Sequence, residues 1–174
     1  MDKAFYSDPT VEWVLPTLRD FTSVHHKLVG IWAEPVIDRG AVHCHSDFAG
    51  AAIWYPPATR FDEEAFFDVI RCCSRPDRIE AFFALVEACG KHRPTAPFWE
   101  LELLAVDPVC QGQGIGSALL EHGLQACVDK TMPVYLESSN PANLSLYRRF
   151  GFELLAEVQL PGTPKRFPML RKAH

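Results

Sequence analysis

A glycine-rich segment, Gln111-Gly112-Gln113-Gly114-Ile115-Gly116-Ser117, is the sequence feature that most constrains how this chain folds. It follows an apolar stretch that predicts a strand over residues 98–106, and it leads into a helical pattern of apolar residues. Because glycines lack a Cβ, backbone N–H groups in such a loop can converge on a ligand, and a helix N-terminus adds unpaired donors and a positive dipole end. The segment therefore predicts an anion-binding site, and a pyrophosphate is the ligand that fits it best.

The spacing of the loop residues limits which cofactor carries that pyrophosphate. A Walker A loop requires a lysine, and this loop has none. A dinucleotide-binding fingerprint requires a third glycine where Ser117 stands. The structural alternative is a tight turn whose glycines only permit close packing. The remaining pattern, Gln-x-x-Gly-x-Gly, resembles the pyrophosphate loop of the GNAT superfamily of acetyl-CoA-dependent N-acetyltransferases.

Further motifs carry the same resemblance. The loop is preceded by Leu-Ala-Val-Asp-Pro at residues 104–108. It is followed, as in the family, by a second cofactor motif at residues 140–152, Asn-Pro-Ala-Asn-Leu-Ser-Leu-Tyr-Arg-Arg-Phe-Gly-Phe. The sequences of residues 92–99, 136–139 and 167–172 resemble those of the puromycin N-acetyltransferase type. The close resemblance covers residues 92–172, whereas residues 1–91 match only in rough layout.

The expected architecture is one N-acetyltransferase domain over residues 1–174. Its class is α/β (α+β), with a GNAT-like mixed, mostly antiparallel sheet flanked by helices. Asp8 and Ser74 are expected to cap helices. The expected strands are 41–45, 50–55, 98–106, 132–138, 152–160 and 166–170. One expected helix begins at Asp8 and is broken or kinked at Pro16, a second runs to about Leu28, and the others cover 62–73, 74–90, 115–127 and 142–150.

The resemblance also implies an earlier part of the fold. Family members open with a strand and a helix before the segment that corresponds to Asp8-Pro9, and this sequence starts at the end of that helix. A shortened N-terminus is therefore expected, with an exposed sheet edge that could impair activity.

The resemblance assigns acetyl-CoA, as co-substrate, to three groups of residues. Backbone groups of the strand segment Leu104, Ala105 and Val106 are expected to pair with the pantetheine arm, and an N–H there would polarise the thioester oxygen. The loop residues Gln111, Gly112, Gln113, Gly114, Ile115, Gly116 and Ser117 would cradle the pyrophosphate. Asn140 and Asn143, on the same helix face as Tyr147, would hydrogen-bond the pantetheine.

Two residues are the expected catalytic groups. Tyr147 stands where the family's general acid toward the CoA thiolate sits, and its alternative role is a core aromatic residue. Glu100 is the first choice for the base, because the resemblance implies a catalytic carboxylate six residues before Val106. A partly buried carboxylate can have its pKa raised toward neutrality and then accept a proton. Glu102, expected on the same strand face as Glu100, Leu104 and Val106, and Glu137 are the other candidates. Each glutamate could instead be an ordinary surface or ion-paired residue.

Other reactive side chains are not expected to take part. The histidines at 25, 26, 43 and 45 show no spacing that compels a metal site, so no metal is predicted. Cys110 is incidental, since the family's chemistry needs no acyl-enzyme. Trp54, Tyr55 and Trp99 could line an acceptor pocket or pack in the core. The six cysteines, Cys127 included, are expected to be free thiols in the cytoplasm.

Composition narrows the function further. The formal net charge of −5 shows no basic surplus for nucleic acid, and no apolar stretch suggests a membrane span. We expect an N-acetyltransferase in which a small-molecule primary amine attacks the thioester directly in a ternary complex; a homodimer is left open. The alternatives are a non-catalytic acyl-CoA-binding or sensor domain and a nucleotide-binding enzyme.

Overall fold

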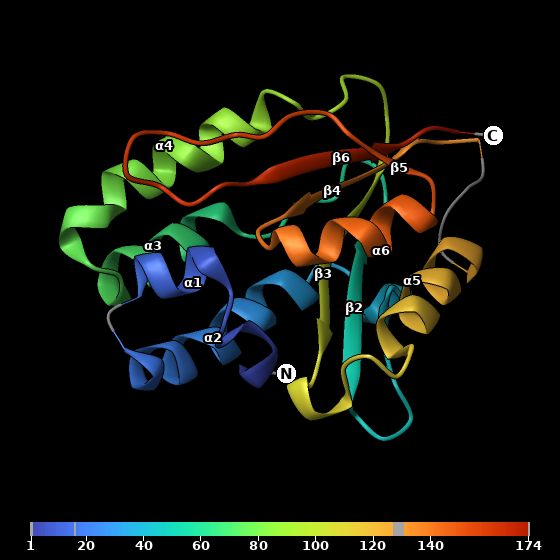
Figure 1. Ribbon diagram of the computed structural model, residues 1–174, viewed down its shortest axis with the longest axis horizontal. Coiled ribbons are helices and arrows are strands. Elements are labelled where there is room, and N and C mark those ends of the chain that lie inside the picture. The colour runs from blue at the N-terminus through green and yellow to red at the C-terminus, as the bar shows by residue number, and fades with distance from the viewer. Residues whose placement is uncertain (1, 16, 127–130, 174) are drawn as a thin grey trace.

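A six-stranded sheet forms the centre of the computed structural model, which describes residues 2–15, 17–126 and 131–173 (Figure 1). The strand order is β1-β2-β3-β4-β6-β5, and every pairing is antiparallel except the parallel pair β3/β4. The strands are β1 (Val42–Cys44), β2 (Gly50–Tyr55), β3 (Trp99–Val106), β4 (Val134–Ser138), β5 (Phe152–Leu154) and β6 (Phe167–Arg171). This confirms the expected fold class, and β1 lies at one edge of the sheet.

Helices surround this sheet. The α-helices are α1 (Pro9–Val14), α2 (Leu18–Ala33), α3 (Glu63–Cys73), α4 (Ile79–Gly90), α5 (Ile115–Ala126) and α6 (Leu144–Arg149), and the 3-10 turns are η1 (Asp2–Phe5), η2 (Ile37–Arg39), η3 (Pro76–Arg78), η4 (Pro108–Cys110) and η5 (Pro141–Asn143). Helix α2 continues five residues past the expected end at Leu28, because Ile31 and Trp32 extend its apolar face into the core. None of the helices in the described ranges is both long and apolar enough to cross a membrane.

The two predicted helix caps have different outcomes. The Asp8 side chain accepts hydrogen bonds from the N–H groups of Thr10 and Val11 at 2.9 and 3.1 Å, so it caps α1 as expected. The cap predicted at Ser74 is wrong. Its hydroxyl caps nothing, because the chain first makes the short turn η3 and begins α4 only at Ile79.

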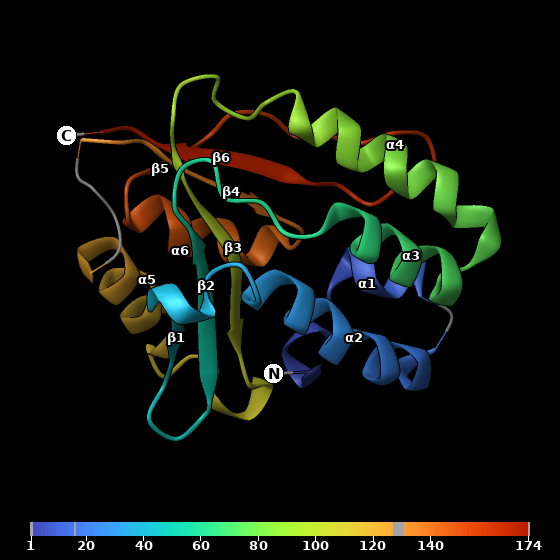
Figure 2. The same ribbon diagram turned by 180° about the vertical axis from the view of Figure 1, so that it is seen from behind.

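Two large apolar cores hold the layers together, and a smaller cluster of Leu85, Cys89 and Val158 joins α4 to the segment after β5. Helix α5 packs on β2 and β3, where the fully buried Trp54 lies directly against Gly123. Helices α1 to α4 share a second core, and Figure 2 shows these helices grouped together beside the sheet. Residues of this core that reach the sheet, such as Phe5 and Trp32, form one wall of the site described below.

The closing strand pair is shorter than predicted. Strand β5 ends at Leu154, because Pro168 opposite Leu155 has no N–H to return a ladder hydrogen bond. The chain then pairs with itself only through the bridge between Val158 and Arg166. The described cysteines are free thiols, while Cys127 lies outside the described residues.

Candidate active site

The strands β3 and β4 separate in the middle of the sheet and leave a wedge between them. Their parallel ladder runs from Trp99 opposite Val134 to Leu101 opposite Leu136 and then stops. Strand β3 nevertheless continues to Val106 and β4 to Ser138, and Figure 1 shows the two strands running in clearly different directions. A cavity of about 880 Å³ opens here, lined by both strands, the glycine-rich loop and the N-terminal helices.

The wedge leaves one edge of β3 free for a ligand. The N–H of Asp107 donates to Ala49 of the β1–β2 turn at 2.8 Å, so its peptide group faces β2. Because successive residues of a strand turn their peptide groups to opposite edges, Ala105 also faces β2, and Leu104 and Val106 face the wedge. These are the two residues predicted to pair with the pantetheine, and the structure leaves their N–H groups available for that role.

The glycine-rich loop presents a row of free donors at the mouth of the wedge. Gly112 and Gly114 have φ of 75° and 87°, a left-handed backbone that glycine adopts without strain. No N–H group from residue 112 to residue 117 donates to a residue in the described part of the chain. These free N–H groups, at the N-terminus of the twelve-residue helix α5, fit a pyrophosphate.

Glutamine side chains stabilise the loop from within. The Gln111 side-chain amide donates to the Val106 carbonyl at 3.2 Å, and that of Gln113 donates to the Val109 carbonyl at 3.3 Å. Both bonds use side-chain N–H groups and carbonyls of the preceding turn. The glutamines therefore fix the loop without occupying the backbone donors.

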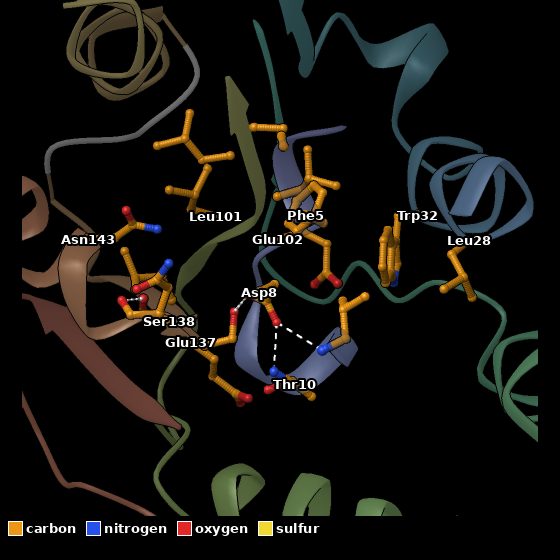
Figure 3. Close-up of a pocket in the computed structure, with 18 of the residues that line it drawn as sticks. Phe5, Asp8, Thr10, Leu28, Trp32, Leu101, Glu102, Glu137, Ser138 and Asn143 are labelled. Carbon is orange, nitrogen blue, oxygen red and sulfur yellow. Dashed lines mark hydrogen bonds between the residues drawn. The ribbon is translucent and has the colours of Figure 1, made fainter. Parts of the chain in front are cut away.

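Helix α6 and the turn before it line the opposite side of the cavity. The Asn140 side-chain oxygen accepts from the N–H of Ala142 at 2.9 Å, so this oxygen caps η5. Asn143 lines the cavity, as Figure 3 shows. Tyr147 is only 7% exposed but also lines the cavity, and burial, with a smaller effect of Asp8, raises its pKa to about 12. The phenol therefore keeps its proton at neutral pH and has one to donate.

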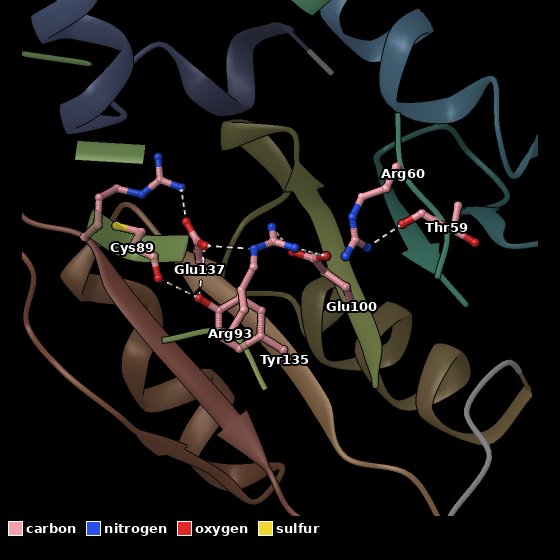
Figure 4. A network of polar contacts seen from close by, with 8 residues as sticks. Thr59, Arg60, Cys89, Arg93, Glu100, Tyr135 and Glu137 are labelled. Carbon is pink, nitrogen blue, oxygen red and sulfur yellow. Dashed lines mark hydrogen bonds and ion pairs between the residues drawn. The ribbon is translucent and has the colours of Figure 1, made fainter. Parts of the chain in front are cut away.

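Two of the three candidate carboxylates are engaged by arginines (Figure 4). Arg93 donates to both oxygens of Glu100, at 2.6 and 2.8 Å. Burial raises the pKa of Glu100, and the Arg93 guanidinium counteracts this effect. Glu137 accepts from the Tyr135 hydroxyl at 2.9 Å and from Arg166 at 3.2 Å. Neither carboxylate is free to take up a substrate proton without losing a bond.

Strand β3 has a β-bulge at Glu102, which changes the face of the sheet on which the neighbouring side chains lie. Across β2, Leu103 lies opposite Ile53 but Leu101 lies opposite Trp54, so Glu102 is the extra residue. The expectation that Glu100, Glu102, Leu104 and Val106 share one face is therefore wrong. Leu104 lies opposite Ala52, on the face of Trp54 and α5, whereas Glu100 lies opposite Tyr55, on the other face.

The Glu102 carboxylate differs from Glu100 and Glu137 because no arginine among the residues that the structure describes binds it. It lines the cavity, and Figure 3 shows it between Phe5 and Trp32 in that view. It has no hydrogen bond or ion pair to any described residue. Burial, followed by the nearby charge of Glu100, raises the pKa of Glu102 to about 8, although Arg93 acts in the opposite direction. A carboxylate with that pKa can accept a proton near neutral pH.

Of the remaining candidates, Tyr55, His25 and Cys110 line the cavity, whereas Trp54, Trp99, His26, His43 and His45 do not. Trp54 is fully buried in the core, and the Tyr55 hydroxyl donates to the Trp32 carbonyl at 2.7 Å. The ring of His43 in β1 lies 4.5 Å from the ring of His122 in α5, outside the cavity. Within the described ranges, no three His, Cys, Asp or Glu side chains form a group suited to a metal ion. Sequence reasoning missed Phe5 and Trp32, because Phe5 precedes the first expected helix and Trp32 lies beyond the expected end of the second helix at Leu28.

Comparison with known proteins supports the interpretation of the wedge and the glycine-rich loop as a coenzyme-binding site. Residues 70–154 match the family model of the acetyltransferase (GNAT) domain. The chain is 24% identical, over 95% of its length, to an uncharacterized N-acetyltransferase of Schizosaccharomyces pombe, and it covers 73% of that protein. A mycothiol acetyltransferase of Thermobifida fusca is 38% identical over 33% of the chain, and the match spans only 19% of that protein.

A solved structure shares the fold. It is the crystal structure of histone acetyltransferase HPA2 and related acetyltransferase from Corynebacterium glutamicum, with a TM-score of 0.65 and 24% identity. The match covers 99% of this chain and 86% of that one. The family model thus identifies a GNAT acetyltransferase domain over residues 70–154, and the solved structure shows that the shared fold extends over 99% of the chain. Domains of this family are acyltransferases whose acetyl donor is acetyl-CoA.

Proposed function

We propose that this protein transfers the acetyl group of acetyl-CoA to a primary amine of a small molecule, by direct attack in a ternary complex. The observation that carries the proposal is the single cavity surface shared by the free loop amides, the free edge of β3 and the Glu102 carboxylate. Such a surface brings a coenzyme and an amine together, which lowers the entropic cost of their reaction. In this proposal residues 1–174 act as one domain, in the cytoplasm.

The coenzyme would be held by backbone groups more than by side chains. The N–H groups of residues 112–117 would bind its pyrophosphate, and Leu104 and Val106 would pair with its pantetheine arm. The Asn143 side chain would add a hydrogen bond from the α6 side. Acetyl-CoA supplies the activated thioester. An N–H of β3 at the wedge would hydrogen-bond the thioester oxygen, as in an oxyanion hole.

Proton transfer is assigned to Glu102 and Tyr147. The Glu102 carboxylate would take a proton from the acceptor's ammonium, because its raised pKa lies close to working pH. The Tyr147 hydroxyl would donate its proton to the departing thiolate sulfur. Glu100 was the expected base, and its carboxylate is bound by Arg93 on both oxygens. We therefore move that role to Glu102 and assign Glu100 the positioning of Arg93.

The proposal is tested by measuring free CoA released from acetyl-CoA in the presence of a panel of primary amines. We expect release that depends on the amine and that falls about 10²-fold or more in Glu102→Gln. Thermal stabilisation by acetyl-CoA without release with any amine would instead support a non-catalytic acyl-CoA sensor. Thermal stabilisation by ATP or NAD but not by acetyl-CoA would show that the glycine-rich loop does not bind the pyrophosphate of CoA.

A further inference from the structure

The part of the cavity next to Glu102 has walls made of aromatic side chains. Phe5 from η1, Trp32 from α2, Phe61 from the segment before α3 and Phe66 from α3 all line it. The ring centroids of Phe61 and Phe66 lie 5.3 Å apart in an edge-to-face contact, and those of Trp32 and Phe66 lie 6.1 Å apart. The rings of Trp32, Phe66 and Phe61 are therefore in contact, and Phe5 lines the same cavity. These four side chains are here called the aromatic wall, on which a flat apolar group can pack.

The charges around the aromatic wall offer a place for one ammonium group. Both oxygens of Glu100 are bound by Arg93, and Glu137 is bound by Tyr135 and Arg166. Glu102 alone among these three carboxylates has no partner in the described ranges. The guanidinium groups of Arg93 and Arg166 also line the cavity, so a second cation there would meet like charge as well as apolar side chains.

Resting on the proposed function, we infer that the acceptor is a monoamine with an aromatic body. Its ring packs against Phe5, Trp32, Phe61 and Phe66, and its amino group lies at Glu102. Polyamines and lysine side chains of basic peptides are poor acceptors, because their further ammonium groups would lose water without finding a buried, unpaired carboxylate. Of the other two carboxylates that line the cavity, Glu63 is exposed and Asp8 accepts hydrogen bonds from the start of α1 and from Ser139. The aromatic wall thus selects the body of the substrate and Glu102 selects its single charge.

The experiment compares acceptors at saturating acetyl-CoA. We expect kcat/KM for tryptamine and phenethylamine to exceed that for n-hexylamine, spermidine and a lysine peptide by at least about tenfold. Trp32→Leu and Phe61→Leu are each expected to raise KM for phenethylamine about two- to tenfold, the value of an aromatic contact, while KM for n-hexylamine stays within twofold. Phe48→Leu is the matched control, since Phe48 is 82% exposed and lies outside the cavity.

Other outcomes would overturn the inference. A preference for spermidine or the peptide, or equal KM changes for aromatic and aliphatic amines, would show that the aromatic wall does not bind the acceptor. If Trp32→Leu lowers the melting temperature strongly, Trp32→Phe takes its place. Calorimetry of phenethylamine binding to CoA-saturated protein gives a second readout without turnover. Binding that Phe61→Leu weakens, with no CoA release, would support the inference and refute the proposed function; release with aliphatic amines only would do the reverse.

Discussion

The ionisation of Glu102 predicts how activity depends on pH. With a pKa of about 8, about one Glu102 side chain in ten is ionised at pH 7 and about nine in ten at pH 9. If the ionised form is the base, kcat/KM rises about tenfold over this range, with a slope approaching one decade per pH unit below pH 7. Glu102→Gln removes the proton acceptor without changing the shape of the side chain. It should lower kcat/KM about 10²- to 10⁴-fold and remove this rise.

The assay must separate the enzyme's ionisation from that of the substrate. Release of CoA is followed from pH 6 to pH 10 with β,β-difluorophenethylamine, whose fluorines lower the basicity of the amine. Glu153→Gln is the matched control, because Glu153 is exposed and pairs only with Lys172 at the surface. A wild-type profile that stays flat between pH 7 and pH 9, or a Glu102→Gln variant that keeps the same rise, would refute the assignment of Glu102 as the base.

The same pKa shift has a consequence for stability. Because the pKa of Glu102 is raised above its ordinary value of 4.5, the folded chain holds a proton between pH 4.5 and pH 8 that the unfolded chain has released. The stability of the wild type therefore falls as pH rises through this range. At about 1.36 kcal/mol per pH unit the cost reaches about 3 kcal/mol at pH 7, and solvent in the open cavity reduces it to about 1–2 kcal/mol.

Glu102→Gln should accordingly be more stable than the wild type at pH 7 and equally stable at pH 4. For a chain of this size the gain corresponds to a rise in melting temperature of about 2–8 °C. Differential scanning calorimetry at both pH values measures it. A variant that is less stable than the wild type at pH 7 would show that the Glu102 carboxylate makes a favourable interaction in the folded state.

Three further substitutions test the packing, the loop and the proton donor. Gly123→Ala should destabilise the fold by about 1–3 kcal/mol, because its Cβ would lie 2.2 Å from atoms of the buried Trp54 ring; Gly90→Ala, with open space around it, should be neutral or slightly stabilising in the same thermal melts. Gly114→Ala should weaken acetyl-CoA binding in calorimetry, since its φ of 87° strains any other residue by about 1–2 kcal/mol; unchanged affinity would show that the loop does not bind the coenzyme. Tyr147→Phe should lower kcat about 10²-fold with little change in the KM for acetyl-CoA, and an unchanged kcat would exclude the hydroxyl as the acid.

The coenzyme side of the site was predictable from the sequence because its chemistry is local. A glycine loop between a strand and a helix positions its own N–H groups, and these are contiguous in the chain from Gly112 to Ser117. Neighbouring residues thus determine the loop before any long-range packing is known. The role of Leu104 and Val106 was expected from the resemblance to the GNAT family, because a free strand edge there depends on where the β3/β4 ladder ends.

The acceptor side was not predictable because its residues meet only through long-range packing. A strict alternation along β3 assigns Glu100 and Glu102 to one face, and the bulge at Glu102 breaks that alternation. The bulge depends on how β3 aligns with β2, which one strand cannot reveal. Arg93 lies close in sequence to Glu100, but nothing in the spacing indicates that the guanidinium binds both carboxylate oxygens. Trp32 reaches the cavity because α2 is longer than its pattern suggested.

The early end of the β3/β4 ladder and the bulge in β3 together explain how one strand serves both substrates. A regular β3, paired with β4 as far as Val106, would satisfy every backbone group and close the wedge. The ladder instead ends at Leu101, immediately before the bulge. Beyond this point β3 keeps an unpaired edge for an extended ligand, and at this point it holds the Glu102 side chain in the cavity. The free strand edge and the misaligned carboxylate are therefore two results of the same irregularity, and neither is available in a regular sheet.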